Sequence, residues 1–259
     1  MSHEHILFIK KFKRDKLIIL FTQIFLFVGF IITWELLAKY EIINSFIFSS
    51  PSLIIKTLLN LYHDNNLFIH IWYTTYEVII SSLICFILSL MISIIFYYNT
   101  IIKKILDPFI ILINSLPKVC LGPLLIIWLG AKTKTIIVNT LLINLIVTFT
   151  TILNGFIKVD KDHYRLFQIL GANKITIIRK LIVPSSRKEI ISALKIDISM
   201  SFIGVIMGEF LSCKKGIGYL ILYGTQVFNL SLVMCGIFIL LLLSFIFYLL
   251  INLLEKKLK

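Results

Sequence analysis

Apolar runs of about 20 residues recur along the whole chain and constrain its fold more than any other feature of the sequence. A helix of that length crosses roughly 30 Å of hydrocarbon, where every backbone N–H and C=O must be satisfied within the segment. The run LIILFTQIFLFVGFIITWELLA (17–38) lacks the alternation that a membrane β-barrel strand requires. The sequence therefore predicts an all-α integral membrane protein.

Six such runs are expected to cross the membrane, and the third of them is unusual. Pro117 and Pro123 interrupt it, and each proline removes a backbone donor and clashes with the preceding turn. A break at membrane depth is stable only where protein or a water-filled cavity surrounds it, so we expect two segments that border a pathway. The expected spans are residues 17–38, 71–97, 105–129, 135–157, 189–211 and 231–254.

Composition supports a single transmembrane domain over residues 1–259. Hydrophobic residues make up 59% of the chain and charged residues 15%, whereas a soluble domain has about one quarter charged. The net charge of +13 is spread around the ends of the apolar runs, which is typical of membrane orientation and not of nucleic-acid binding. The four cysteines and five histidines have no spacing typical of a disulfide framework or a metal site.

The positive charges indicate which connections face the cytoplasm, because cytoplasmic loops carry an excess of Lys and Arg. One side of the membrane receives the basic residues of 1–16, 103–104, 158–188 and 256–259. The other side receives Lys39, Lys56, Lys132, Lys134, Lys214 and Lys215. We therefore expect both termini to be cytoplasmic, with a tail over residues 1–16 and a loop over residues 158–188.

A short amphipathic helix is expected on the outer side, in the segment FSSPSLIIKTLLNLYHDNNLF. Ser49 or Ser50 is a suitable N-cap, because a serine hydroxyl accepts a hydrogen bond from a free amide of the first turn. Pro51 would occupy the first helical position, where its fixed φ suits a helix start.

The cytoplasmic loop contains RLFQILGANKITIIRKLIVPSSRKE (165–189), which mixes apolar and basic residues at helical spacing. We expect two short helices joined at Gly171, where glycine can adopt a positive φ. Pro184 lacks a backbone N–H and restricts Val183 before it, so the second helix should end near this point. Composition alone allows either an interfacial element held on anionic lipid or a docking element for a cytosolic partner.

The string LGANKITIIRKLIVP resembles the cytoplasmic EAA loop of ABC-transporter permeases, in which a glycine is followed thirteen positions later by a proline. Gly171 and Pro184 hold these positions here. The acidic residue and two alanines that name the loop are replaced by Arg165, Leu166 and Phe167, so the first half of the motif differs. The other matching positions are Leu170, Ala172, Leu181 and Val183.

Three further segments are similar to the taurine, nitrate and sulfonate branch of these permeases and occur in the family's order. SSPSLIIKTL is similar to its outer Pro-Ser helix, and SLPKVCLGPLLIIWLG is similar to its segment with Pro-Lys, Pro and Trp-x-Gly. GEFLSCKKGIGYLI is similar to its Glu followed by Gly-x-Gly, here Glu209, Gly216 and Gly218. With the loop, the resemblance covers most of residues 49–222.

The resemblance implies a permease subunit of the bacterial cytoplasmic membrane that pairs with a second permease, most simply as a homodimer. It implies two cytosolic ATPase subunits, which bind ATP and Mg and hold the loop in a groove, and an extracytoplasmic binding protein. The implied solute is small and polar or anionic: a sulfonate, taurine, nitrate or a vitamin precursor. This chain would have no catalytic residue, cofactor or metal of its own, and it contains no G-x-x-x-x-G-K-[ST] phosphate loop.

The residues implied to couple the chain to the ATPase are Arg165, Leu166, Phe167, Leu170, Gly171, Ala172, Leu181, Val183 and Pro184, and the implied pathway residues are Pro117, Pro123 and Glu209.

Two acids within the fifth expected span are candidates for function, because charged groups are costly at membrane depth. Asp197 and Glu209 are separated by about 18 Å of helical rise, so they are too distant to form a dyad. We expect Asp197 to be satisfied inside the bundle, and Glu209 either to cap the glycine-rich turn or to border the pathway. Gly204 and Gly208 begin a small-residue face that allows close helix packing, with the partner helix left open.

Two other functional classes stay open from the residues alone. An ion-driven secondary transporter would need charged sites near mid-membrane and often has paired repeats. A polytopic membrane enzyme would need clustered histidines or carboxylates at one interface. Neither pattern is evident, and the four family-like segments favour the permease.

Overall fold

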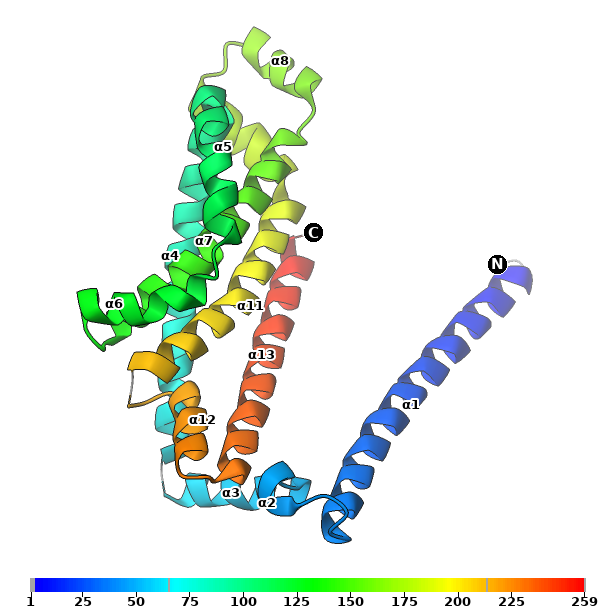
Figure 1. Cartoon of the computed structure of the whole chain (residues 1–259). Helices are drawn as coiled ribbons and strands as arrows, with labels where there is room; N and C mark the ends of the chain where they lie inside the picture. The colour runs from blue at the N-terminus through cyan, green and yellow to red at the C-terminus, as the bar shows by residue number, and fades with distance from the viewer. Residues whose placement is uncertain (1–2, 65, 213, 259) are drawn as a thin grey trace.

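The computed structural model describes residues 3–64, 66–212 and 214–258, and this part of the chain is built of helices without a strand (Figure 1). Within it, five helices are long and apolar enough to cross a membrane, or six if one bent pair counts as a span. The five are α1 (His3–Lys39), α4 (Asn66–Tyr98), α7 (Thr133–Ile157), α11 (Arg187–Ser212) and α13 (Leu230–Leu258). The all-α membrane fold is confirmed.

The third expected span is broken near its prolines. Its pieces are α5 (Thr100–Ser115), the 3₁₀ turn η1 (Lys118–Leu121) and α6 (Gly122–Leu129). The two halves are bent by 83°. Leu116 ends α5 with an extended ψ of 137°, as a residue before proline favours, and Pro123 lies in the first turn of α6, where no intrahelical hydrogen bond is lost.

The most extensive helix contact in the described part joins α11 to α7. Glycines on α11 make this approach possible. A Cβ added at Gly204 would lie 2.8 Å from the Thr140 Cα, and one at Gly208 would lie 3.1 Å from the Ile136 Cα. The small-residue face predicted for this span therefore packs against another helix of the same chain.

A polar cluster lies inside the bundle where α7 meets α11. The Asn144 amide donates to Asp197 Oδ1 at 3.2 Å and to Ser201 Oγ at 2.7 Å, and all three residues are buried. Asp197 Oδ2 is buried without a hydrogen-bond partner among the described residues. The expectation that Asp197 is satisfied inside the bundle thus holds for one carboxyl oxygen and not for the other.

Three shorter helices gather at one end of the bundle, which we call the turn end (Figure 1). They are α2 (Ser45–Phe48), α3 (Pro51–His63) and α12 (Ile217–Gln226). The Leu53 N–H donates to Ser50 Oγ at 3.3 Å, so Ser50 is the N-cap of α3 and Pro51 its first residue. The amphipathic helix predicted on the outer side is confirmed as a helix.

The opposite end carries the predicted two-helix loop, and we call it the loop end (Figure 1). Its elements are α8 (Lys161–Ile169), α9 (Lys174–Ile177), the π-turn η2 (Ile178–Ile182) and α10 (Val183–Ser185).

The first long helix stands apart from the others and meets the rest of the chain near α2 and α3 (Figure 1). It begins at His3, so residues 3–16 of the expected tail are helical, while their cytoplasmic position stays a prediction. Cys213, one of the four cysteines, lies outside the described residues.

Candidate functional site: a two-helix loop and a buried turn

The joint of the loop at Gly171 is a Schellman motif. Gly171 has φ of 74°, its N–H donates to the Gln168 carbonyl at 3.0 Å, and the Ala172 N–H donates to the Phe167 carbonyl at 3.0 Å. Asn173 then caps the next helix, because its Oδ1 accepts from the Thr176 N–H at 2.8 Å. The positive φ and the two helices predicted at Gly171 are confirmed, and the joint is tightly defined.

We call α8 the first arm of the loop and the segment from α9 to α10 the second arm. The second arm packs against the bundle. Leu181 and Ile182 are buried and belong to one apolar cluster with Ile152 and Phe156 of α7. The arm continues through a π-turn, in which the Val183 N–H donates to the Ile178 carbonyl. The helix ends at Ser185, one residue beyond Pro184, as predicted.

The first arm instead presents large apolar side chains outward. Ile169 is 83% exposed, Leu170 73% and Leu166 50%, and Ile175 across the joint is 74% exposed. These four residues, which we call the exposed loop face, lie among charged neighbours. Contiguous exposed apolar side chains typically mark an interaction site.

The nine residues predicted to couple the chain to an ATPase fall into two groups. Leu166 and Leu170 belong to the exposed loop face, and Arg165 is exposed beside Asp162, with 3.7 Å between Arg165 Nη1 and Asp162 Oδ1. Phe167 and Ala172 are partly buried against the cluster of the second arm. Leu181 and Val183 belong to the same cluster, Pro184 is partly buried, and Gly171 forms the joint.

The start of the loop is stabilised by Asp160, the N-cap of α8. Its Oδ1 accepts from the Asp162 N–H at 2.9 Å, and its Oδ2 lies 3.3 Å from His163 Nδ1. The backbone hydrogen bond, with a smaller contribution from His163, holds the pKa of Asp160 below its usual value.

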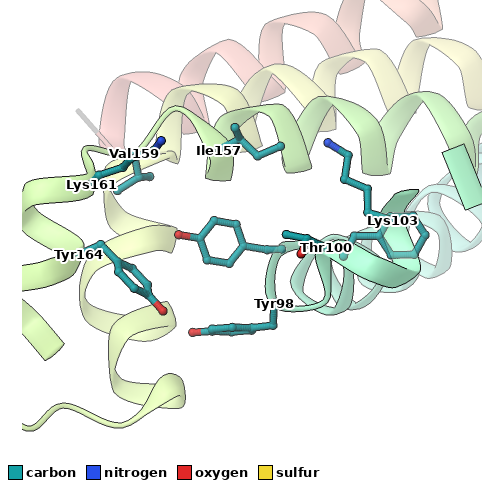
Figure 2. A pocket seen from close by; sticks show the side chains of 9 residues that line it. Tyr98, Thr100, Lys103, Ile157, Val159, Lys161 and Tyr164 are labelled. Atoms are coloured by element: carbon teal, nitrogen blue, oxygen red, sulfur yellow. The ribbon is translucent and has the colours of Figure 1, made fainter. Parts of the chain in front are cut away.

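A second attachment joins the loop to α4. The Tyr98 hydroxyl donates to the Lys174 carbonyl at 2.8 Å, and Lys174 Nζ stands 5.5 Å from the centre of the Tyr98 ring. Beside it opens a pocket of about 470 Å³, in which the hydroxyl groups of Tyr98 and Tyr164 point toward one another (Figure 2). Lys103 and Lys161 also line this pocket. The loop is therefore held against both α4 and α7.

At the turn end, side chains from two helices bind three successive amides of the glycine-rich turn. The Gly216 N–H donates to His70 Nδ1 at 3.1 Å, and the Ile217 N–H donates to Thr74 Oγ1 at 2.8 Å. The Gly218 N–H donates to Glu209 Oε2 at 2.5 Å. The free amides at the start of α12 are thus satisfied by α4 and α11.

The glycines of this turn leave space for the Glu209 carboxyl group. A Cβ at Gly216, where φ is 107°, would overlap that carboxyl group, and a Cβ at Gly218 would lie 2.7 Å from Glu209 Oε2. The Thr74 hydroxyl donates to Glu209 Oε1 at 2.6 Å. This geometry explains why a Glu and a Gly-x-Gly occur together in the sequence.

The three predicted pathway residues lie in different surroundings. Glu209 is fully buried and caps the turn, whereas Pro117 is exposed at the break between α5 and η1. Pro123 lies in α6 beside the contact of Gly122 with Leu211. The structure does not bring the three together, and their role in a pathway stays a prediction.

The α4 residues of this site were not among the residues predicted from the sequence. His70, Thr74 and Glu77 follow one another at helical spacing, which places them on one face of α4. That face is buried at all three positions. The spacing of polar residues within an apolar run was the available signal.

Comparison with known proteins gives a family. Residues 88–259 match the family described as "Binding-protein-dependent transport system inner membrane component". The chain is 24% identical to the formylaminopyrimidine transport permease protein ThiX of Halalkalibacterium halodurans, over 74% of this chain and 76% of that protein. It is 23% identical to the putative aliphatic sulfonates transport permease protein SsuC of Bacillus subtilis, over 87% and 82%. It is 22% identical to the taurine transport system permease protein TauC of Escherichia coli, over 87% and 84%.

The fold is also similar to a solved structure. A chain of the MetNI methionine ABC transporter, solved in inward-facing conformations, superposes with a TM-score of 0.67 at 16% identity. The match covers 74% of this chain and 96% of that chain.

Proposed function

This chain belongs to the family of binding-protein-dependent transport system inner membrane components, and from that premise we propose how it acts as the permease subunit of an ABC importer. The match confirms the resemblance found in the sequence and favours this class over an ion-driven transporter or a membrane enzyme. The chain is a multi-pass inner-membrane protein and a transport subunit. We place the loop end and both termini in the cytoplasm, where the excess of Lys and Arg puts them.

The exposed loop face carries this proposal. Ile169, Leu170 and Ile175 are each more than 70% exposed, although the joint between them is fixed by backbone hydrogen bonds. A rigid group of exposed apolar side chains on a charged surface is typical of a segment that binds in a groove of a partner protein. We assign this partner as a cytosolic ATPase subunit, which binds the ATP and Mg that the importer consumes.

Attachment of the loop to the bundle supports coupling. The second arm packs on α7 through Leu181 and Ile182, and α7 in turn makes the most extensive helix contact of the described residues with α11. Movement of the loop by the ATPase would therefore be passed to packed helices, and such helices shift as bodies and do not deform continuously.

The bent segment α5–α6 supports pairing with a second permease. Its large apolar side chains are widely exposed, with Ile127 at 81%, Trp128 at 71% and Leu112 at 65%. We propose that part of this surface faces a second copy across the pathway, near Pro117 and Pro123, and that lipid covers the rest. A separate binding protein would deliver the solute on the side of the turn end.

The solute class follows from the relatives' names. These relatives transport a formylaminopyrimidine, aliphatic sulfonates or taurine, according to their names. We propose a small polar or anionic solute of this kind for the present chain.

Co-purification with a matched pair of variants tests the docking assignment. Gly171 and Gly130 both have positive φ, and at both positions a Cβ would meet no atom within 4 Å. Each glycine is replaced by tryptophan in the tagged chain, which is extracted from its native host in mild detergent and examined by mass spectrometry. We expect an ATPase with a phosphate-loop motif in stoichiometric amount with the wild type and with Gly130→Trp, and its loss with Gly171→Trp.

Two results would contradict the assignment. Equal recovery of the ATPase with Gly171→Trp and with the wild type would show that the loop joint is not the docking site. A wild-type chain that purifies alone, under conditions that keep other transporter complexes intact, would leave the loop as a lipid-binding element.

A further inference from the structure

Two carboxyl groups are buried together at the turn end. Glu209 is 0% exposed and Glu77 is 1% exposed. Thr74 touches Glu209 through its hydroxyl, and Glu77 lies one helical turn further along the same face of α4. Because Thr74 binds Glu209 and Glu77 follows Thr74 on the same buried face, the two carboxyl groups are neighbours inside the bundle.

Among the ion pairs of the described residues, none includes Glu77 or Glu209. Other titratable side chains at the turn include Lys215 and His70. Lys215 is exposed, and its Nζ donates to the Tyr73 hydroxyl at 3.3 Å. His70 Nδ1 accepts from the Gly216 N–H, so this nitrogen carries no proton. Two adjacent buried carboxylates without a cation repel each other strongly, and sharing one proton relieves the repulsion.

The hydrogen bonds indicate which residue carries the proton. Glu209 accepts from the Thr74 hydroxyl and from the Gly218 N–H, which is the pattern of an ionised carboxylate. Both oxygens of Glu77 are buried and have no partner among the described residues. We propose that Glu77 is protonated and donates its O–H to the Glu209 carboxylate.

This assignment makes Glu77 a positioning residue for the turn. Glu209 would then receive three donors, one each from Thr74, Glu77 and Gly218, which compensate its burial. The proton would join α4 to α11 and α12 at the end of the bundle opposite the loop. In this arrangement the buried pair of acids holds α4, α11 and α12 together and does not bind a solute.

Infrared difference spectroscopy tests the proton directly. The whole chain is reconstituted in lipid nanodiscs at neutral pH, and the spectrum of Glu77→Gln is subtracted from that of the wild type. We expect a C=O stretching band of a protonated carboxyl group, which is separate from the carboxylate bands. Glu209→Gln should retain a protonated-carboxyl band from Glu77. Asp197→Asn serves as the control, because it removes a different buried acid.

Thermal stability provides a second readout. Glutamine at position 77 can still donate to Glu209, so Glu77→Gln should keep the midpoint of thermal unfolding within about 2 °C of the wild type. Leucine has a similar size but no donor, so Glu77→Leu should lower the midpoint by about 5 °C. The pair of variants separates loss of the donor from loss of volume.

Three outcomes would overturn the assignment. Absence of a protonated-carboxyl band from the difference spectrum of Glu77→Gln would mean that Glu77 is ionised. A band lost in Glu209→Gln and kept in Glu77→Gln would place the proton on Glu209. A Glu77→Leu chain as stable as Glu77→Gln would show that no hydrogen bond is donated from this position.

Discussion

Two glycine turns stand at opposite ends of the bundle, and they use the same backbone conformation for different purposes. Gly171 at the loop end has φ of 74°, and Gly216 at the turn end has φ of 107°. A Cβ at Gly171 would meet nothing within 4 Å, whereas a Cβ at Gly216 would overlap the Glu209 carboxyl group. Gly171 forms the joint between two short helices next to the exposed loop face. Gly216 leaves the space that the buried Glu209 carboxyl group needs beside the backbone of the turn.

The surroundings of the two turns differ accordingly. The loop joint is closed by its own backbone and leaves Ile169 and Leu170 exposed. The amides of the turn at Gly216 bind side chains of two other helices. The positive φ of a glycine therefore does not identify its role. The role is indicated by the space beside the glycine, which is open at the docking surface and filled by a carboxyl group at the structural joint.

The largest expected effect comes from a methyl group at each turn. Gly216→Ala should destabilise the chain by about 4 kcal/mol, because backbone strain adds to overlap with Glu209. Gly171→Ala has strain without overlap and should cost about 1 kcal/mol. Thermal unfolding of the purified variants in one detergent measures the difference. Equal losses at the two positions would remove the distinction between the turns.

Adjacent threonines on α4 provide the next test. Thr74→Val removes the donor to Glu209 and the acceptor for the Ile217 N–H, so we expect a loss of about 2 kcal/mol. Thr75 Oγ1 is buried without a partner among the described residues, so Thr75→Val should change stability by less than about 0.5 kcal/mol. Denaturation curves compare the two. A larger loss for Thr75→Val would contradict the hydrogen-bond account of the turn end.

A substitution on the exposed loop face should weaken binding of the ATPase and leave the stability of the chain unchanged. Leu170→Asp places a charge on the exposed loop face, where unfolding free energy should change by less than about 0.5 kcal/mol. Capture of the ATPase should fall by roughly tenfold, as expected for a residue at the centre of an interface. Quantitative pull-down from membranes measures this capture. Asp at the likewise exposed Leu59 of α3 is the control and should leave capture unchanged.

The smallest effect concerns the cap of α8. Because the pKa of Asp160 is lowered in the folded chain, the stability that its carboxylate contributes to the start of α8 is present at neutral pH. This stability is lost as the pH falls through that lowered pKa. Asp160→Asn keeps the acceptor for the Asp162 N–H and should not show this dependence. Hydrogen exchange at the Asp162 amide, compared between the two chains from neutral to acidic pH, measures the loss of the cap. A ratio of the two exchange rates that stays constant with pH would contradict this role of the Asp160 carboxylate.

Sequence reasoning was most successful where one local rule decides the structure. Apolar runs located the spans, Gly171 and Pro184 marked the joint and the end of the loop, and Pro117 and Pro123 marked the broken span. Each of these depends on residues close together in the chain. The N-cap at Ser50 belongs to the same class.

Pairings between distant segments could not be predicted in the same way. Glu209 was predicted either to cap the glycine-rich turn or to border the pathway, but its partner Thr74 lies 135 residues away, and nothing local indicates this contact. Gly204 indicated close packing without naming Thr140 of α7 as the neighbour. The division of the nine loop residues into exposed and anchored groups also required the fold, because the burial of Leu181 depends on its packing against Ile152 and Phe156 of α7.

Site-specific photo-cross-linking tests the central claim most directly. A photoreactive phenylalanine analogue replaces Leu170 at the loop end or Leu59 at the turn end, two leucines that are 73% and 50% exposed. Irradiation of intact cells is followed by purification of the tagged chain and mass spectrometry of its adducts. We predict an adduct with the ATPase from position 170 and none from position 59. An ATPase that co-purifies with the chain but cross-links only from position 59 would contradict the assignment of the loop as its docking surface.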